Sequence, residues 1–251
     1  MDIRLLLHTI LGLLLLLIPV GVLYHLERTV LRTFLLTTVR MGAQLLVLCL
    51  VVWVLYKVDS PWLLLAWLLT IAVASGFLVL KRCGQKGLRL LPAVSGGLFV
   101  SVAFVALWLL TLALPVRVFD PHWFVPVTAL LMGHATAMAI RGLSTYLSVL
   151  KADEQQYEFL RGNGASHLKA LRPFMRRAIG AVISPSVANL RVLALTSMPL
   201  LLVGLFMGGL SPINAFVVML LMVVACVSVA VLALALIIFF SDRTLFDKRT
   251  I

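Results

Sequence analysis

Acidic residues are scarce in this chain of 251 residues, which carries nine Asp and Glu against 21 Lys and Arg. Charged residues of both signs make up 12% of the sequence, about half the share of an average globular domain, whereas 63% of the residues are hydrophobic. A water-soluble fold has too little polar surface to cover so many apolar side chains. The composition therefore excludes a soluble enzyme, a nucleic-acid-binding protein and a disordered chain, and it indicates an integral membrane protein.

Motifs for catalysis, for ATP hydrolysis and for metal or disulfide frameworks are also missing. No G-x-x-x-x-G-K-[ST], H-E-x-x-H or G-x-S-x-G pattern occurs, and the three cysteines show no C-x-x-C spacing. No carboxylate falls deep within an apolar run, where proton-driven transporters usually hold one. We therefore expect that the chain is not itself an enzyme, that it holds no cofactor, and that any uphill transport draws its energy from another subunit.

Apolar runs long enough to cross a bilayer recur along the chain. A helical crossing needs about 20 predominantly apolar residues. The predicted spans are residues 5–23, 41–56, 61–80, 93–114, 123–140, 180–207 and 213–240. The first of them is predicted to be a retained span rather than a signal peptide, because no cleavage site follows it. We expect an all-α membrane protein with about seven spans that form a single transmembrane domain over residues 1–251.

Positive side chains are distributed unevenly between the two faces that these spans define. With the N-terminus outside, 17 of the 21 Lys and Arg fall in cytoplasmic connections or in the C-terminal tail, and the first connection holds Arg28, Arg32 and Arg40. Cytoplasmic loops are enriched in Lys and Arg, beside anionic lipid headgroups. The distribution therefore predicts that the N-terminus lies outside and the C-terminus inside.

The longest polar stretch is the segment of residues 151–179, between the fifth and sixth predicted spans. Residues 152–161 contain no helix breaker and predict a short polar helix, which the glycines of residues 162–164 end by adopting positive φ. Ser166 is the predicted N-cap of a second helix, which Pro173 bends back towards the bilayer. A short surface helix that returns stiffly to a span is suited to receive a displacement from a partner.

This segment resembles the coupling loop of ABC permeases, in which a Glu precedes a Gly by six positions, as Glu158 precedes Gly164. Residues 158–212 are similar to the pattern of the FetB family of ABC permeases, which is roughly E-A-x-x-A-x-G-A-T, R-P, R-x-A and S-L-P-G-M-M-T-G-Q-I-L-G-G-x-S-P. The similarity covers about residues 25–250. Its upstream matches are Leu26-Glu27-Arg28, Arg40-x-x-x-Gln44-Leu45 and Pro126 with Gly133-His134.

The resemblance implies a permease that pairs as a homodimer with two copies of a separate ABC ATPase, which binds ATP and Mg²⁺. Bacterial members lie in the inner (plasma) membrane and are associated with iron export, and related plant proteins with aluminium tolerance and nucleotide-sugar export. Membrane lipids are the other expected partners, and nucleic acid is not one. The residues that would couple the chain to the ATPase are Glu154, Glu158, Arg161, Gly164 and Ala165.

A transport pathway is predicted from polar, sulfur-containing or helix-bending residues in or near the spans. The candidates are Arg40, Gln44, His134, Arg191, Met198 and Pro199. His134 is either a ligand for a metal ion or a hydrogen-bonding residue between helices, and Arg40 either lines the path or extends to the interface. Gly204 and Gly208 permit close helix packing, which we expect at the dimer contact.

The substrate path departs from the family pattern, because residues 199–205 replace polar Thr and Gln by aliphatic side chains. Three functions therefore remain open at this point. The chain exports iron or another metal ion, it exports an apolar, lipid-linked or nucleotide-sugar molecule, or it is a membrane scaffold that binds an ATPase without transport.

Overall fold

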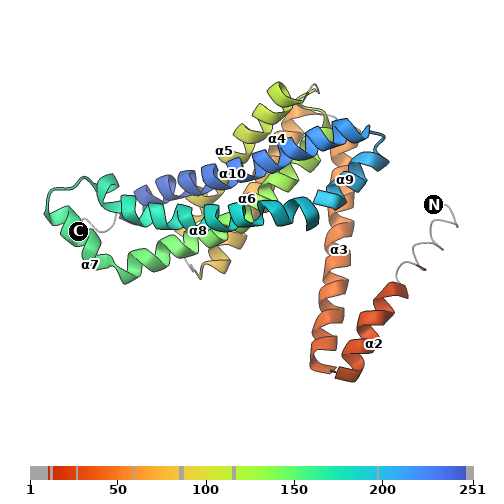
Figure 1. Cartoon of the computed structure of the whole chain (residues 1–251), viewed down its shortest axis with the longest axis horizontal. Helices are drawn as coiled ribbons and strands as arrows, with labels where there is room; N and C mark the ends of the chain where they lie inside the picture. Colours follow the sequence, from red (N-terminus) through yellow and green to blue (C-terminus); the bar gives the residue numbers. More distant parts are fainter. Residues whose placement is uncertain are drawn as a thin grey trace. The chain divides into compact units, whose positions relative to one another are not determined.

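The computed structural model describes residues 11, 14–26, 28–58, 60–84, 88–114, 117–196 and 198–246, and its regular secondary structure there is entirely helical (Figure 1). The predicted all-α class is confirmed. The chain divides into two compact units, Met1–Lys57 and Val58–Ile251. Each unit is described by itself below, and the single domain over residues 1–251 stays a prediction.

The first unit contains η1 (Leu14–Leu16), α2 (Leu17–Leu26) and α3 (Arg28–Val58). The hydroxyls of Thr37 and Thr38 donate to the carbonyl oxygens of Thr33 and Phe34, at 2.7 and 2.9 Å, so these polar groups are satisfied within α3. The predicted connection over residues 28–40 is wrong, because this stretch contains no glycine or proline and forms the first turns of α3. Of the predicted span 5–23, residues 5–10, 12 and 13 lie outside the described residues.

The second unit contains all the remaining helices. They are α4 (Pro61–Arg82), η2 (Leu88–Leu90), α5 (Leu91–Trp108), the π-helical η3 (Leu109–Ala113), α6 (Pro121–Ala152), α7 (Glu154–Gly162), α8 (His167–Thr196), α9 (Met198–Met207) and α10 (Pro212–Phe246). Proline begins α4, α6 and α10, where its missing N–H is not needed. Asp120 caps α6, because its carboxylate accepts a hydrogen bond from the backbone N–H of His122 at 3.0 Å.

Glycines set the closest contacts of the second unit, in which α5 packs against α4 and α10, and α6 against α4, α8 and α10. A Cβ on Gly76 would lie 3.1 Å from that of Ser95, and a Cβ on Gly97 would lie 2.9 Å from the backbone nitrogen of Ile237. Because these two positions have no side chain, α4 can approach the backbone of α5, and α5 the backbone of α10. Small residues allow the same close approach between other membrane helices.

Within the described part of the chain, five helical segments are long and apolar enough to cross a membrane, and they correspond to the second, third, fourth, fifth and seventh predicted spans. They are Val30–Val58, Pro61–Arg82, Leu91–Ala113, Pro121–Ala152 and Pro212–Ser241. The sixth predicted span falls on the second half of α8 and on α9, on either side of Ser197, which lies outside the described residues. The count of seven spans and their orientation stay predictions.

Candidate functional site

The helix α7 lies at one end of the second unit (Figure 1), and most of its residues are exposed. None of its residues is buried, and Phe159 is 69% exposed. The helix ends in a Schellman motif, in which the N–H of Ala165 donates to the carbonyl of Leu160, and the N–H of Gly164 to that of Arg161, both at 3.1 Å. Gly164 has φ +81°, the left-handed conformation that glycine adopts most readily. The predicted short helix is confirmed, with bounds 154–162 in place of 152–161. Of the two glycines predicted to adopt positive φ only Gly164 does so, because Gly162 is the last residue of α7.

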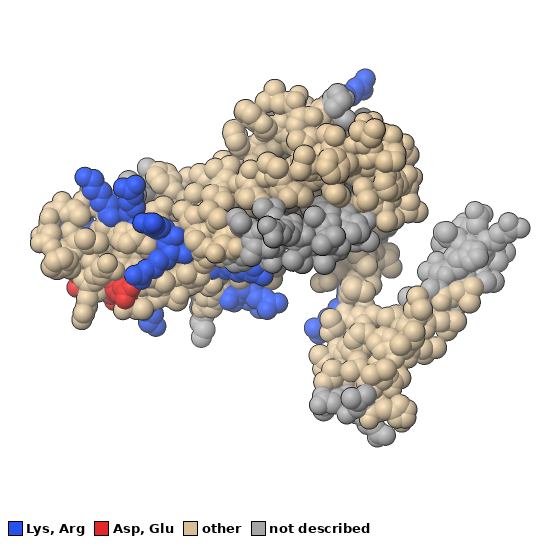
Figure 2. Space-filling view, viewed as in Figure 1, with Lys and Arg blue, Asp and Glu red and all other residues tan. Residues whose placement is uncertain are grey.

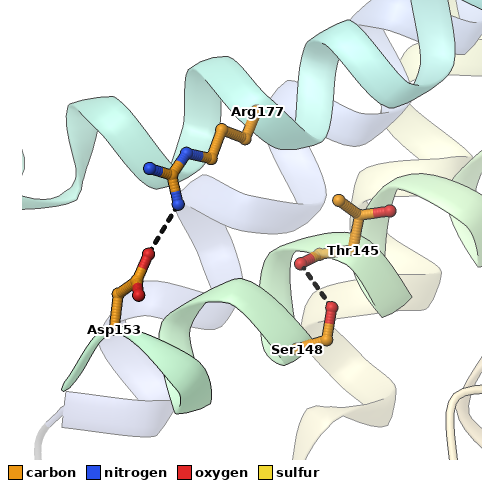
Figure 3. A network of polar contacts seen from close by, with 4 residues as sticks. All are labelled: Thr145, Ser148, Asp153 and Arg177. Atoms are coloured by element: carbon orange, nitrogen blue, oxygen red, sulfur yellow. Dashed lines mark hydrogen bonds and ion pairs between the residues drawn. The ribbon is translucent and has the colours of Figure 1, made fainter.

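An ion pair ties the beginning of α7 to α8 (Figure 3). The guanidinium of Arg177, on α8, donates to the carboxylate of Asp153 at 2.6 Å, and Asp153 is the single residue between α6 and α7. The two side chains are 53% and 40% exposed, so solvent limits the pair to about 0–1 kcal/mol. The pair therefore positions the start of α7 more than it stabilises the fold.

Four of the five predicted coupling residues lie exposed on or directly after α7: Glu154, Glu158, Arg161 and Gly164. The fifth, Ala165, is half-buried, and its carbonyl oxygen accepts a hydrogen bond from the Arg161 guanidinium at 3.3 Å. Glu154 and Glu158 stand one helical turn apart, so they share a face of α7. The arrangement presents two carboxylates beside an exposed aromatic ring, and their coupling role stays a prediction.

Positive charge surrounds α7 on the same end of the unit. Figure 2 shows Lys and Arg gathered over this end, whereas the opposite end near α9 has almost none in this view. The exposed residues are Lys151 at the end of α6, Arg161 on α7, and Lys169, Arg172, Arg176 and Arg177 on α8. Such a surface attracts anionic lipid headgroups or an acidic partner.

The predicted pathway residues are spread over four helices. Arg40 and Gln44 lie exposed on α3 of the first unit, and His134 lies half-buried on α6 of the second. The ring Nε2 of His134 is buried and has no hydrogen-bond partner among the described residues. The described residues contain no group of three or more His, Cys, Asp or Glu that could hold a metal ion. The backbone is helical at the other candidates, whose side chains lie outside the described part: Arg191, Met198 and Pro199.

A cavity of about 520 Å³ opens at the end of the second unit opposite α7, between the first turns of α6, the end of α9 and the first turns of α10. Its lining residues are His122, Trp123, Pro126, Val127, Leu130, Gly204, Leu205, Gly208, Leu210, Val218 and Met222. Gly204 and Gly208 lie here, and a Cβ on Gly204 would have open space around it. No described residue of another helix approaches either glycine closely, so their packing role at a dimer contact stays a prediction.

Sequence reasoning missed this cavity. Its lining carries no catalytic or metal-binding pattern, and its wall on α6 lies more than 70 residues before its walls on α9 and α10 in the chain. The available signal was weak: two glycines one turn apart leave a helix without side chains on one face, and both line the cavity.

Comparisons with known proteins connect the chain to several membrane proteins. It is 28% identical over 182 residues to the UPF0014 membrane protein slr1647 of Synechocystis, a match covering 69% of this chain and 68% of that protein. It is 27% identical over 160 residues to Protein ALUMINUM SENSITIVE 3 of Arabidopsis thaliana, covering 62% of this chain and 56% of that one. It is 28% identical over 165 residues to the UPF0014 membrane protein STAR2 of rice, covering 62% and 54%.

The matches to the two plant proteins span little more than half of each plant chain. No solved structure matches the chain. The family model described as "Uncharacterised protein family (UPF0014)" matches residues 6–246, which cover most of both compact units and every described helix. The chain is therefore a member of the UPF0014 family of membrane proteins.

Proposed function

We propose that the chain is the permease subunit of an ABC transporter, and that two copies of it work with two copies of a separate ATPase. The observation that carries the proposal is α7, a helix without a buried residue that projects from a packed helical unit. Glu158 and Gly164 stand on and after this helix with the spacing of the coupling loop that they resemble. The similarity to UPF0014 membrane proteins supports the assignment to a membrane transport system.

In this proposal α7 delivers mechanical work from the ATPase to the membrane helices. One residue, Asp153, separates it from α6, and four residues separate it from α8. A displacement of α7 therefore moves the ends of two long helices at once. Phe159 is the apolar anchor on its exposed face, since aromatic side chains supply much of the binding energy of protein interfaces.

The proposed cargo is iron or another metal ion, which the resemblance to FetB permeases implies. His134 is the residue to test as a ligand, because its Nε2 is buried on α6 without a partner among the described residues. Export is the proposed direction, and an apolar, lipid-linked or nucleotide-sugar cargo is the alternative. A scaffold without transport would bind the same ATPase but would show no cargo-dependent turnover.

The test uses the purified chain in lipid nanodiscs together with the ATPase subunit encoded in the same genome. Binding of the ATPase tests the docking helix, and ATP hydrolysis by the complex tests the cargo. We expect Glu158→Lys to weaken binding of the ATPase by roughly tenfold, because a positive charge replaces a carboxylate at the contact. Gln156→Lys is the matched control, since Gln156 is exposed on a different face of α7.

Equal binding by both variants and the unchanged chain would exclude α7 as the docking helix. A panel of metal ions, lipids and sugar nucleotides then identifies the cargo by stimulation of the unchanged complex. Loss of metal stimulation in His134→Ala, with stimulation by other cargo retained, identifies His134 as a ligand.

A further inference from the structure

The cavity at the end opposite α7 has a lining that is almost wholly apolar. Among the described residues that line it, the only titratable side chain is that of His122, which is exposed on the first turn of α6. Burying a charged group without a partner is costly, so a metal ion or a charged headgroup is excluded from the interior. We propose that this cavity binds the alkyl chain of an amphipathic molecule, with the polar end of that molecule at His122. The proposal does not depend on an ATPase partner.

The dimensions of the cavity suit a single chain. Its wall on α6 runs from His122 to Leu130, which is about 12 Å along the helix axis at 1.5 Å per residue. Its volume of about 520 Å³ lies within the range of small-molecule sites, about 300–1,000 Å³. An alkyl chain therefore fits.

The polar start of α6 meets the apolar cavity at its rim. Asp120 caps α6 two residues before the exposed His122, and Trp123 follows in the cavity lining. Aromatic residues gather at membrane interfaces. The nearby turn between α9 and α10 exposes Met207 and Ile213 by 85% and 77%. An amphipathic molecule matches this boundary, because its headgroup stays at the polar rim while its chain enters the cavity.

Trp123 provides a direct probe of the proposed ligand. We expect bromododecanoic acid to quench the fluorescence of a variant that keeps only this tryptophan, in nanodiscs of unbrominated lipid, with a saturable dependence on its mole fraction. Val218 is 6% exposed and lines the cavity, whereas its neighbour Val217 is 45% exposed and lies outside the lining. Val218→Phe should raise the half-saturating concentration about tenfold by filling the space, and Val217→Phe should leave it unchanged.

A second measurement uses the unaltered chain, so that it does not depend on the folding of the tryptophan variant. A fatty acid with a diazirine on its chain should label peptides containing residues 122–130 or 204–222.

A phospholipid brominated on its acyl chain distinguishes two sources of the alkyl chain. Quenching of Trp123 by this phospholipid as well as by the fatty acid identifies a bilayer lipid, and quenching by the fatty acid alone identifies a single-chain amphipath. Quenching that rises linearly, or equal effects of the two valine substitutions, would overturn the proposal.

Discussion

The two ends of the second unit differ in what they expose, although both close with the same turn. At one end α7 finishes in a Schellman motif with Gly164 in the left-handed conformation, and at the other α9 finishes in the same motif with Gly209 at φ +84°. Around α7 the surface is charged and exposed to solvent, and around α9 it is apolar and contains the cavity. Identical backbone closure therefore supports two different surfaces, and side chains alone decide which partner each end can bind.

A single helix joins these ends. α6 begins at Pro121, directly before the first residue of the cavity wall, and ends at Ala152 beside α7, while α10 packs against it and against α5. The ends can act on each other only if this middle region is rigid.

The largest effect is expected at the contact between α5 and α10. Gly97→Ala should lower the free energy of unfolding by roughly 1–3 kcal/mol, because the new Cβ would lie 2.9 Å from the backbone nitrogen of Ile237 and the helices must separate. The adjacent Gly96→Ala is the control, since its Cβ meets nothing within 4 Å, and it should be neutral or slightly stabilising. Thermal unfolding in detergent measures the stability of both variants. Equal unfolding midpoints for the two would show that α5 and α10 can rearrange to accommodate the added Cβ.

A smaller effect is expected where α7 ends. Gly164→Ala should cost roughly 1–2 kcal/mol locally, because a Cβ is strained at φ +81°. Gly162→Ala lies two residues earlier, within the helix and with open space around it, and should leave α7 intact. Hydrogen exchange of the α7 amides is the measurement. Faster exchange in both variants alike would mean that the turn does not depend on the left-handed glycine.

The smallest effect is expected from the ion pair that positions α7. Arg177→Ala should change the global free energy of unfolding by at most about 1 kcal/mol, because both partners are partly exposed. It should nevertheless increase hydrogen exchange at the start of α7, and the charge swap Asp153→Arg with Arg177→Asp should restore protection. Arg176→Ala, at the next position of α8, is the control. An unchanged exchange rate in Arg177→Ala would remove the positioning role of the pair.

Local patterns made the charged end predictable. The glycines at 162 and 164 and the polar run before them are sufficient to place α7, and apolar length is sufficient to place the spans that became α4, α5, α6 and α10. Local reasoning was wrong at Arg28, Arg32 and Arg40, because positive charge suggested a connection where the absence of helix breakers lets α3 begin.

Features that depend on contact between distant residues were not predictable. Gly96 and Gly97 are adjacent and chemically identical, yet only Gly97 faces the backbone of α10. The cavity likewise requires the first turns of α6 to meet α9 and α10, and nothing in the spacing of Trp123, Leu205 and Val218 indicates that meeting. His134 could be selected as a buried polar residue, but its lack of a partner among the described residues emerged only from the packing of α6.

The turn after α9 also limits the hydrogen bonds that the protein can donate to a molecule bound in the cavity. The N–H groups of Gly208, Gly209 and Leu210 all donate to carbonyls of α9, at 3.0, 2.9 and 3.1 Å. These N–H groups are therefore not available to a ligand. Leu205 and Leu210, which the Schellman motif brings together, line the cavity and have apolar side chains. Selectivity at this end must therefore come from length and shape rather than from backbone recognition, so a homologue with a longer side chain at either leucine should accept shorter tails.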